Sequence, residues 1–249
     1  LDGVDGVINL AGESIGAGRW SDERKALLRS SRVDSTSALV RAIEQAKSRP
    51  HVFVSQSAVG YYGDCGDSFV TESHAPGSDF LARLCVDWEA AAGPAERMGV
   101  RVVHPRTGVV LARGGGSLSP LLTPFKLFVG GPLGSGRQWF PWVHRDDVIG
   151  MLTLALERED VRGPMNVTSP EPSTMREFAA ALGTAMHRPS AFPVPGFALR
   201  AMVGEFADTL LGGQRAIPVV ARELGYTFAY PSLLPALREA VTKVDSLEE

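Results

Sequence analysis

The chain has 249 residues, of which 44% are hydrophobic and 21% are charged, and its formal net charge is −3. These proportions are ordinary for a globular protein and exclude an intrinsically disordered or collagen-like chain. The negative charge argues against a nucleic-acid partner held on a basic face. Because no run of about 18 apolar residues occurs, we expect no membrane-spanning segment.

The cysteines and histidines exclude two further classes of protein. The two cysteines, Cys65 and Cys85, are too few for a disulfide framework or a structural zinc site. The five histidines have no metal-ligand spacing, so we expect no metal. With no secretory segment visible, the sequence predicts a cytoplasmic protein.

Strand-like and helical segments alternate through the first half of the chain. Because strand and helix alternate at this spacing, we expect right-handed βαβ units and an α/β fold with a parallel sheet flanked by helices. The predicted elements are a strand at 7–10, a helix from a cap at Ser21 to about Lys47, a strand at 51–55, a loop at 60–78, a helix at 79–98, a strand at 100–103, and residues 109–111, which extend that strand or form a small one.

The second half is more broken by glycine and proline. We predict glycine-rich loops at 114–116 and 130–136, a helix at 120–129, an extended piece at 142–144, a helix capped by Asp146 or Asp147, a strand at 165–167, a helix from a cap at Thr174 to about 187, and a mostly helical tail from 196 that ends in a helix at 235–247.

Small or polar residues follow three of the predicted strands, at Asn9–Gly12, Ser55–Ser57 and Arg106–Gly108. The carboxyl ends of parallel strands border the ligand crevice of such sheets. We therefore expect these three strand ends to converge. At the first, Asn9, Leu10, Ala11 and Gly12 would let a flat ligand approach the backbone closely. A simple turn explains the same residues about equally well.

The second strand end carries hydroxyl groups that suit catalysis. Ser57 could orient a carbonyl or hydroxyl of a substrate, and Tyr61 or Tyr62 could donate a proton. The alternative is a serine-rich turn whose tyrosines pack over the edge of the sheet.

The loop at 134–147 offers a polar set for a substrate with a ring or a phosphate, through Arg137, Gln138 and Trp142. The alternative here is structural. Asp146 has the place of a helix cap, and a histidine such as His144 is more often a hydrogen-bonded structural residue than a catalyst.

Taken together, these motifs resemble the NAD(P)-binding, epimerase-like branch of the short-chain dehydrogenase/reductase superfamily, in its atypical form. The matching segments are Asn9–Glu13, Arg19-Trp20, Ser57–Gly63, Asp87–Glu89, Arg106–Leu111, Gly134–Trp139 and Trp142–Asp147. Residues from about 192 to 237 resemble the subgroup's C-terminal domain of unknown function, notably at Leu211–Arg215 and Leu224–Phe228.

The resemblance implies a Rossmann-like domain over residues 1–190, with substrate-side loops at 112–147, and a smaller helical domain over 191–249. It implies NADP as the cofactor, with NAD as the alternative. The residues that would line the cofactor crevice are Asn9, Leu10, Ala11, Gly12, Ser55, Arg106, Thr107 and Gly108. The 130–147 loop and the C-terminal part would close over a small-molecule substrate such as a nucleotide sugar.

The sequence departs from that family in two respects. The family's glycine-rich phosphate turn and first βαβ unit would precede Leu1, and that turn is the main anchor of a dinucleotide pyrophosphate. A chain complete as given would bind the cofactor weakly or not at all, whereas a longer parent would bind it.

The second departure concerns catalysis. Active members of the superfamily carry a Tyr and a Lys four residues apart on one helix face, where the Lys lowers the tyrosine pKa. The equivalent positions here are Leu81 and Cys85. Three hypotheses follow: an NADP(H)-binding oxidoreductase-like protein, a catalytically inactive cofactor-binding or scaffolding module, or a nucleotide-sugar epimerase. The sequence gives no oligomeric state.

Overall fold

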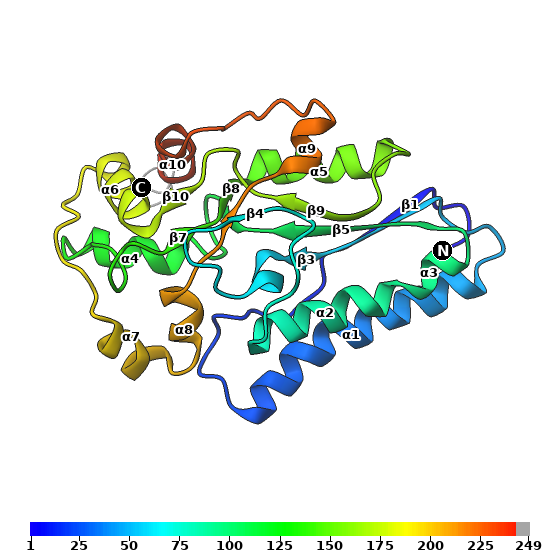
Figure 1. Cartoon of the computed structure of the whole chain (residues 1–249), viewed down its shortest axis with the longest axis horizontal. Helices are drawn as coiled ribbons and strands as arrows, with labels where there is room; N and C mark the ends of the chain where they lie inside the picture. Colours follow the sequence, from blue (N-terminus) through cyan, green and yellow to red (C-terminus); the bar gives the residue numbers. More distant parts are fainter. Residues whose placement is uncertain (243–249) are drawn as a thin grey trace.

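The computed structural model describes residues 1–242 and has a parallel sheet with helices on both faces (Figure 1). Strands β1 (Gly6–Asn9), β2 (Val52–Ser55) and β5 (Arg101–Thr107) are neighbours in that order, and β9 (Gly163–Val167) also pairs with β5. All of these pairs are parallel. The predicted α/β fold with a parallel sheet is therefore confirmed.

The strand β3 (Ser57–Ala58) follows β2 after a single residue, Gln56, and pairs in parallel with the end of β5. The strand β5 is buried along its whole length, and it runs through Pro105 to Thr107, beyond the predicted end at residue 103. A strand covered on both faces reads as a continuous apolar run, which is why Val52–Val54 and Val102–Val103 were recognisable.

The helices α1 (Asp22–Gln45), α2 (Phe80–Ala92) and α3 (Pro94–Arg97) cover one face of the sheet, and α5 (Arg145–Glu157) covers the other (Figure 1). Ser21 caps α1 by accepting a hydrogen bond from the amide of Arg24, as its position predicts. The single helix expected at 79–98 is divided at Gly93, because Pro94 has no amide hydrogen to continue the series of hydrogen bonds.

Three pairs of short strands lie outside the main sheet. The strand β6 (Val109–Leu111) pairs in parallel with β8 (Trp142–His144), so residues 109–111 form a small strand of their own. The strand β7 (Trp139–Phe140) pairs with β10 (Ser173–Thr174), and β4 (Phe69–Val70) pairs with β11 (Arg215–Ala216). These pairs fasten the connecting loops to one another.

A second predicted helix cap, that of α6, is confirmed, and the predicted cap of α5 is wrong. Thr174 caps α6 (Met175–Met186) in a capping box with Glu177. The cap of α5 is His144 and neither Asp146 nor Asp147, because the imidazole of His144 accepts the hydrogen bond from the Asp146 amide. Asp147 is buried instead, and its carboxylate accepts hydrogen bonds from the amides of Ala229 (2.7 Å) and Tyr230 (3.0 Å).

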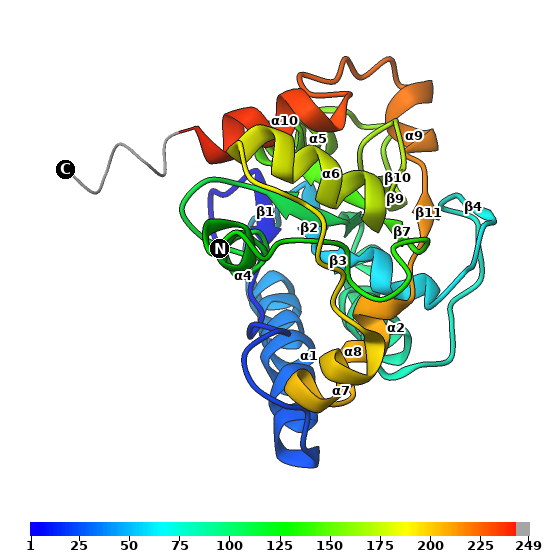
Figure 2. The same ribbon diagram turned by 90° about the vertical axis from the view of Figure 1, so that its left-hand side faces the viewer.

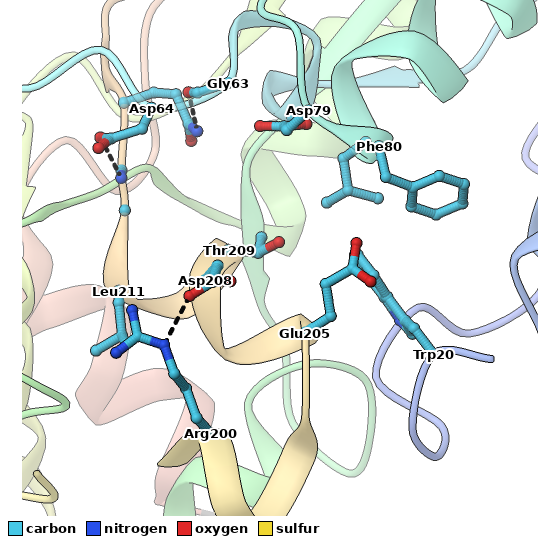
Figure 3. Close-up of a pocket in the computed structure, with 15 residues that line it drawn as sticks. Trp20, Gly63, Asp64, Asp79, Phe80, Arg200, Glu205, Asp208, Thr209 and Leu211 are labelled. Atoms are coloured by element: carbon cyan, nitrogen blue, oxygen red, sulfur yellow. Dashed lines mark hydrogen bonds and ion pairs between the residues drawn. The ribbon is translucent and has the colours of Figure 1, made fainter. Parts of the chain in front are cut away.

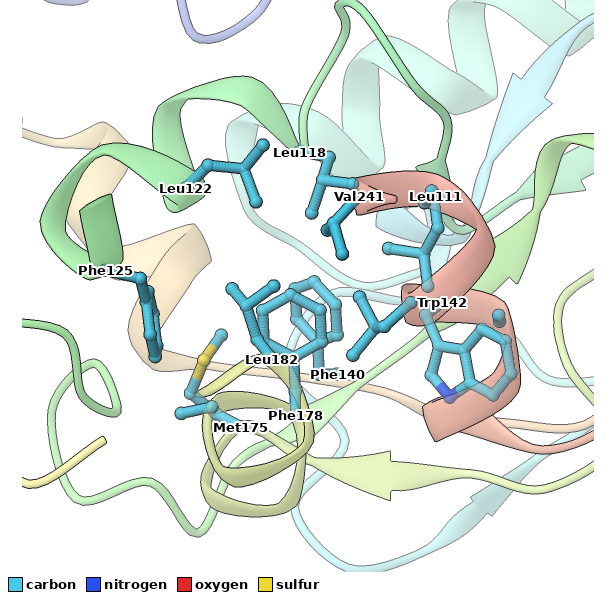
Figure 4. Packing of buried hydrophobic residues seen from close by; sticks show 14 residues of the cluster. Leu111, Leu118, Leu122, Phe125, Phe140, Trp142, Met175, Phe178, Leu182 and Val241 are labelled. Carbon is cyan, nitrogen blue, oxygen red and sulfur yellow. The ribbon is translucent and has the colours of Figure 1, made fainter. Parts of the chain in front are cut away.

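The remaining helices are α4 (Ser119–Lys126), α7 (Gly196–Val203), α8 (Phe206–Leu211), α9 (Val219–Glu223) and α10 (Leu233–Val241). The helix α10 lies against α6 (Figure 2). It begins two residues before the predicted start at 235, and the predicted end at 247 falls outside the described residues. A buried cluster joins α10 to α4, α6, β6, β7 and β8 (Figure 4). Among residues 1–242, no helix combines the length and apolar character that a bilayer crossing requires.

Candidate functional site

The three strand ends singled out in the sequence lie next to one another. Asn9 is opposite Ser55 where β1 pairs with β2, and Ser57 is opposite Arg106 where β3 pairs with β5. Because these pairs are parallel, all three ends open on the same edge of the sheet. This carboxyl edge is where α/β proteins of this type bind their ligands.

Asn9 fixes the loop that follows β1. Its buried side chain donates to the Thr36 hydroxyl (2.9 Å) and accepts from the Ala11 amide (3.1 Å). Leu10 is 60% exposed, and Ala11 and Gly12 are exposed as well. The loop is therefore held in place while the backbone of residues 10–12 stays accessible.

Ser57, Glu89 and Arg106 form a buried polar network. The Ser57 hydroxyl donates to Glu89 (2.6 Å), and the Arg106 guanidinium donates to both Glu89 oxygens (2.8 and 2.9 Å). Burial lowers the pKa of Arg106, but the hydrogen bond and charge of Glu89 outweigh it, so the net pKa lies above its ordinary value. The Ser57 hydroxyl is consequently turned inward and the side chain is fully buried.

The two tyrosines are in different environments. The Tyr62 hydroxyl donates to Asn166 (2.7 Å) and accepts from Arg106 (3.1 Å), and burial raises the pKa of Tyr62 to about 12. The ring of Tyr61 lies 3.4 Å from the Arg106 guanidinium and is half-buried. Of the two proton donors proposed from the sequence, only Tyr61 reaches solvent.

Two buried oxygens at the second strand end lack partners. Ser55 Oγ and Gln56 Oε1 accept and donate no hydrogen bond within the described part of the chain. The Gln56 amide nitrogen donates to Thr107 Oγ1 (2.7 Å), which ties β2 to the end of β5. Gly108 follows, and a Cβ there would lie 2.3 Å from the Pro141 carbonyl oxygen, so the close approach of the two segments requires glycine.

The three residues proposed from the 134–147 loop are not brought together at the strand ends. Trp142 is 1% exposed and packs in the cluster of Figure 4, so its indole belongs to the core and we leave it out of the site. Gln138 donates to the carbonyls of Leu133 (3.0 Å) and Leu210 (3.1 Å), which braces the loop. Arg137 is exposed.

A cavity of about 440 Å³ adjoins this edge, between the start of α2 and the helices α7 and α8 (Figure 3). Gly60, three residues after Ser57, is the lining residue nearest to the strand ends in the chain, and Leu81 of α2 also lines the cavity. The other lining residues are Trp20, Gly63, Asp64, Asp79, Phe80, Arg200, Glu205, Asp208, Thr209, Leu211, Gly212, Gly213 and Gln214.

None of the site residues proposed from the sequence lines this cavity. Its side chains come from segments far apart in the chain, and no local pattern marks them as neighbours. The one available signal was the family resemblance, because Arg19-Trp20 and Leu211–Arg215 are among the segments that carry it. A second hollow of about 490 Å³, around His51 and Arg101, lies at the opposite, amino edge of the sheet.

Leu81 and Cys85 occupy the positions where the resemblance puts a Tyr and a Lys. Both lie on the buried face of α2, with Leu81 at the cavity wall. Burial raises the pKa of the Cys85 thiol to about 12. In residues 1–242 no group of three or more His, Cys, Asp or Glu side chains is arranged to hold a metal ion.

The parallel sheet with helices on both faces defines a Rossmann-like protein, and the accessible backbone after β1 and the adjoining cavity make its carboxyl edge the candidate ligand site. The chain belongs to the NAD dependent epimerase/dehydratase family, whose model matches residues 1–168. A domain of unknown function (DUF1731) matches residues 194–240.

The chain is 43% identical over 244 residues to the epimerase family protein MT2273 of Mycobacterium tuberculosis, covering 98% of this chain and 80% of the relative. It is 42% identical over 242 residues to the mouse (Mus musculus) epimerase family protein SDR39U1, covering 95% and 82%. The crystal structure of human SDR39U1 (isoform 2) with NADPH matches with a TM-score of 0.93 and 37% identity, over 98% of this chain and 84% of that one.

A second solved structure, a nucleoside-diphosphate sugar epimerase from Corynebacterium glutamicum, matches with a TM-score of 0.75 and 33% identity. The match covers 95% of this chain and 46% of that one. Both solved structures share the fold of this chain.

Proposed function

We propose that this protein binds NADP(H) along the carboxyl edge of β1, β2 and β5 and acts on a small-molecule substrate in the adjoining cavity. The observation that carries the proposal is the likeness to the human protein crystallised with NADPH, which extends over 98% of this chain. A bound nicotinamide would supply hydride transfer, and NAD is the alternative cofactor.

The residues at the edge suit a dinucleotide. The exposed backbone of Leu10–Gly12 offers close contact to a flat ligand, and Asn9 holds that loop in place. The unpartnered oxygens of Ser55 and Gln56 are hydrogen-bonding groups that a polar ligand could satisfy. Arg106, Thr107 and Gly108 hold the neighbouring strand end in register, and we propose that they support the crevice.

Cofactor binding is tested by titrating the protein with NADPH and NADH and following the cofactor fluorescence. We expect the lower Kd for NADPH, because NADPH is the cofactor in the crystal structure of the human relative. Ala11→Trp should raise the Kd for NADPH by about tenfold or more, because the new ring would cover the accessible backbone. Ala191→Trp, also at an exposed loop position, is the control. Equal affinity of both variants would contradict the proposed crevice.

A second candidate function is a cofactor-binding module without catalysis. The observation that favours it is the pair Leu81 and Cys85 on α2, which cannot exchange protons as a Tyr–Lys pair does, together with the inward Ser57 hydroxyl. Oxidation of NADPH with a panel of aldehydes and ketones separates the two functions. Turnover above a blank excludes the module. If turnover is found, Tyr61→Phe should slow it by about a hundredfold, since Tyr61 is the candidate proton donor that is not fully buried and it directly follows the cavity-lining Gly60 in the chain.

We also propose a cytoplasmic location. Cys65 and Cys85 are both unpaired, and a reducing compartment keeps such thiols reduced.

A further inference from the structure

The cavity of Figure 3 has an aromatic wall on one side. The rings of Trp20 and Phe80 are 5.1 Å apart in an edge-to-face arrangement, and the ring of Phe206 is 5.4 Å from Trp20. Trp20 and Phe80 both line the cavity. In the sequence, Trp20 precedes α1 and Phe80 follows it at the start of α2. A wall of this kind favours a ligand with a flat or apolar part.

Four carboxylates surround the rest of the cavity: Asp64, Asp79, Glu205 and Asp208. Two of them are paired with cations. Asp208 accepts from Arg200 Nε at 2.9 Å, and Glu205 lies 2.6 Å from Lys25 Nζ, which also sits 5.3 Å from the centre of the Phe80 ring. Each of these two cations therefore already has a carboxylate partner at the cavity.

Asp64 and Asp79 have only backbone partners. Asp64 accepts from the Gly213 amide (3.1 Å), and Asp79 accepts from the Ala82 amide at the start of α2 (2.8 Å). Within the described chain neither takes part in an ion pair. The four lining carboxylates, Arg200 and the Lys25 ammonium that pairs with Glu205 from outside the lining have a combined formal charge of −2, counting every carboxylate as ionised.

The charge decides which ligands fit. A nucleoside diphosphate is itself an anion, and in this cavity its phosphates would share Arg200 and Lys25 with the carboxylates that already neutralise them, while Asp64 and Asp79 repelled the phosphates. Carboxylate oxygens accept hydrogen bonds and donate none, so a good ligand must present amino or hydroxyl hydrogens. The aromatic wall adds a requirement for a ring.

We propose that this cavity binds a phosphate-free, ring-bearing molecule that presents hydrogen-bond donors, with a protonated amine preferred over a carboxylate. The inference rests on the proposed function only in treating this ligand as the substrate beside the cofactor. A phosphate-free ligand would differ from the substrate of a nucleotide-sugar epimerase, which carries a diphosphate.

The test uses three probes of stated charge: phenethylamine as the cation, phenylacetate as its anionic counterpart of similar size, and UDP-glucose as the diphosphate. Binding is followed through the indole N–H signal of Trp20 in ¹⁵N-labelled protein, assigned with Trp20→Phe. The Trp20 indole N–H donates to the Ile15 carbonyl (3.0 Å), so its signal reports a ligand through the change in environment of the ring that lines the cavity. We expect phenethylamine to bind about tenfold or more tightly than phenylacetate at low salt, and UDP-glucose to leave the Trp20 signal unchanged.

Removing two of the charges should reduce the preference. In Glu205→Gln/Asp208→Asn the cavity loses two negative charges and Arg200 and Lys25 lose their partners. The affinity for phenethylamine should then exceed that for phenylacetate by about threefold or less. Added salt should also lower this ratio for the wild-type protein. Glu44→Gln/Asp160→Asn removes two exposed charges outside the cavity and should leave the ratio unchanged. If the double variant does not fold, Glu205→Gln alone serves, since that side chain is 48% exposed.

Two results with these probes would overturn the inference. Tighter binding of phenylacetate or UDP-glucose at Trp20 would show that the carboxylates do not set the ligand charge, and no shift with any probe would show that the cavity is not a ligand site. NADPH binding is recorded separately by cofactor fluorescence. Loss of NADPH binding with an intact amine preference would contradict the proposed function and leave this inference standing.

Discussion

The Arg106 side chain joins three separate parts of the molecule. It forms an ion pair with Glu89 of α2, hydrogen-bonds Tyr62 of η1 (Val59–Tyr62) and donates to the Glu72 carbonyl. The side chains of Arg106 and Glu89 are only 4% and 13% exposed. A buried charge is stable only with its partner, so the network fastens the helix, the loop and the strand end together.

Loss of one partner should be costly. We expect Glu89→Gln to lower the free energy of unfolding by about 3–5 kcal/mol, because Arg106 would remain buried without a counter-charge. Asp87→Asn is a matched control on the same helix: its ion pair with Arg29 is about half exposed and should contribute less than about 1 kcal/mol. Chemical denaturation measures both variants. Equal effects would mean that burial of the pair is unimportant.

Tyr62 makes stability depend on alkaline pH. Burial raises its pKa to about 12, while an unfolded tyrosine titrates near about 10. Tyr62 therefore stabilises the fold fully below pH 10, and this contribution is lost as the pH rises from about 10 to about 12. We expect wild type to lose of the order of 2 kcal/mol more than Tyr62→Phe over this window, measured as the difference between their denaturation curves. Parallel pH profiles would refute the assignment, since other groups titrate equally in both proteins.

At the scale of secondary-structure elements, the ends of the helices are set by a few side chains. Thr174 accepts from the Glu177 amide, and the Glu177 carboxylate accepts from the Thr174 amide (2.7 Å) and hydroxyl (2.9 Å). This reciprocal arrangement satisfies amides that the first turn of α6 would otherwise leave unpaired.

The capping box gives a prediction for α6. Thr174→Ala should destabilise the protein by about 1 kcal/mol, because it removes the side chain that accepts at the helix start. Thr184→Ala, at an exposed position inside the same helix, should be neutral or slightly stabilising, since alanine is the better helix former. Thermal unfolding followed by circular dichroism compares the two. The cap assignment fails if Thr184→Ala is the more destabilising change.

At the scale of the whole molecule, the C-terminal residues share a core with the rest of the chain. Leu237 and Ala240 of α10 are fully buried, and they belong to the same cluster as Phe178 and Leu182 of α6 and as Trp142; Figure 4 shows the packing of this cluster. The Glu239 carboxylate of the same helix lies 2.9 Å from the buried His144 imidazole. These contacts couple α10 to α6 and to the end of β8.

This coupling predicts that α10 unfolds together with the parts it contacts. Leu237→Ala should lower the free energy of unfolding by about 2–5 kcal/mol through the cavity it leaves, and should shift a single transition rather than create a second one. Leu127→Ala, where the leucine is 67% exposed, should change stability by less than about 0.5 kcal/mol. Tryptophan fluorescence and circular dichroism should give coincident denaturation curves, and separate curves would indicate an independently folding C-terminal part.

The sequence alone was enough to predict the main strands of the parallel sheet, most of the longer helices and their order along the chain. Buried parallel strands form continuous apolar runs, as in Val52–Val54, and cap residues such as Ser21 and Thr174 act on amides three residues away, so both are visible in a short window. Because parallel strands open on one edge, the adjacency of Asn9, Ser55 and Arg106 also followed from the order alone.

The environment of each of these side chains became clear only from the tertiary structure. Side-chain environment depends on contacts between distant segments, so no local pattern shows that Ser57 is turned toward Glu89, that Trp142 is in the core or that His144 rather than Asp146 caps α5. The cavity has the same origin: Trp20, Asp79 and Glu205 meet only after α8 packs beside the start of α2. Its negative charge comes from carboxylates in different parts of the sequence, which lie around one cavity only in the folded protein.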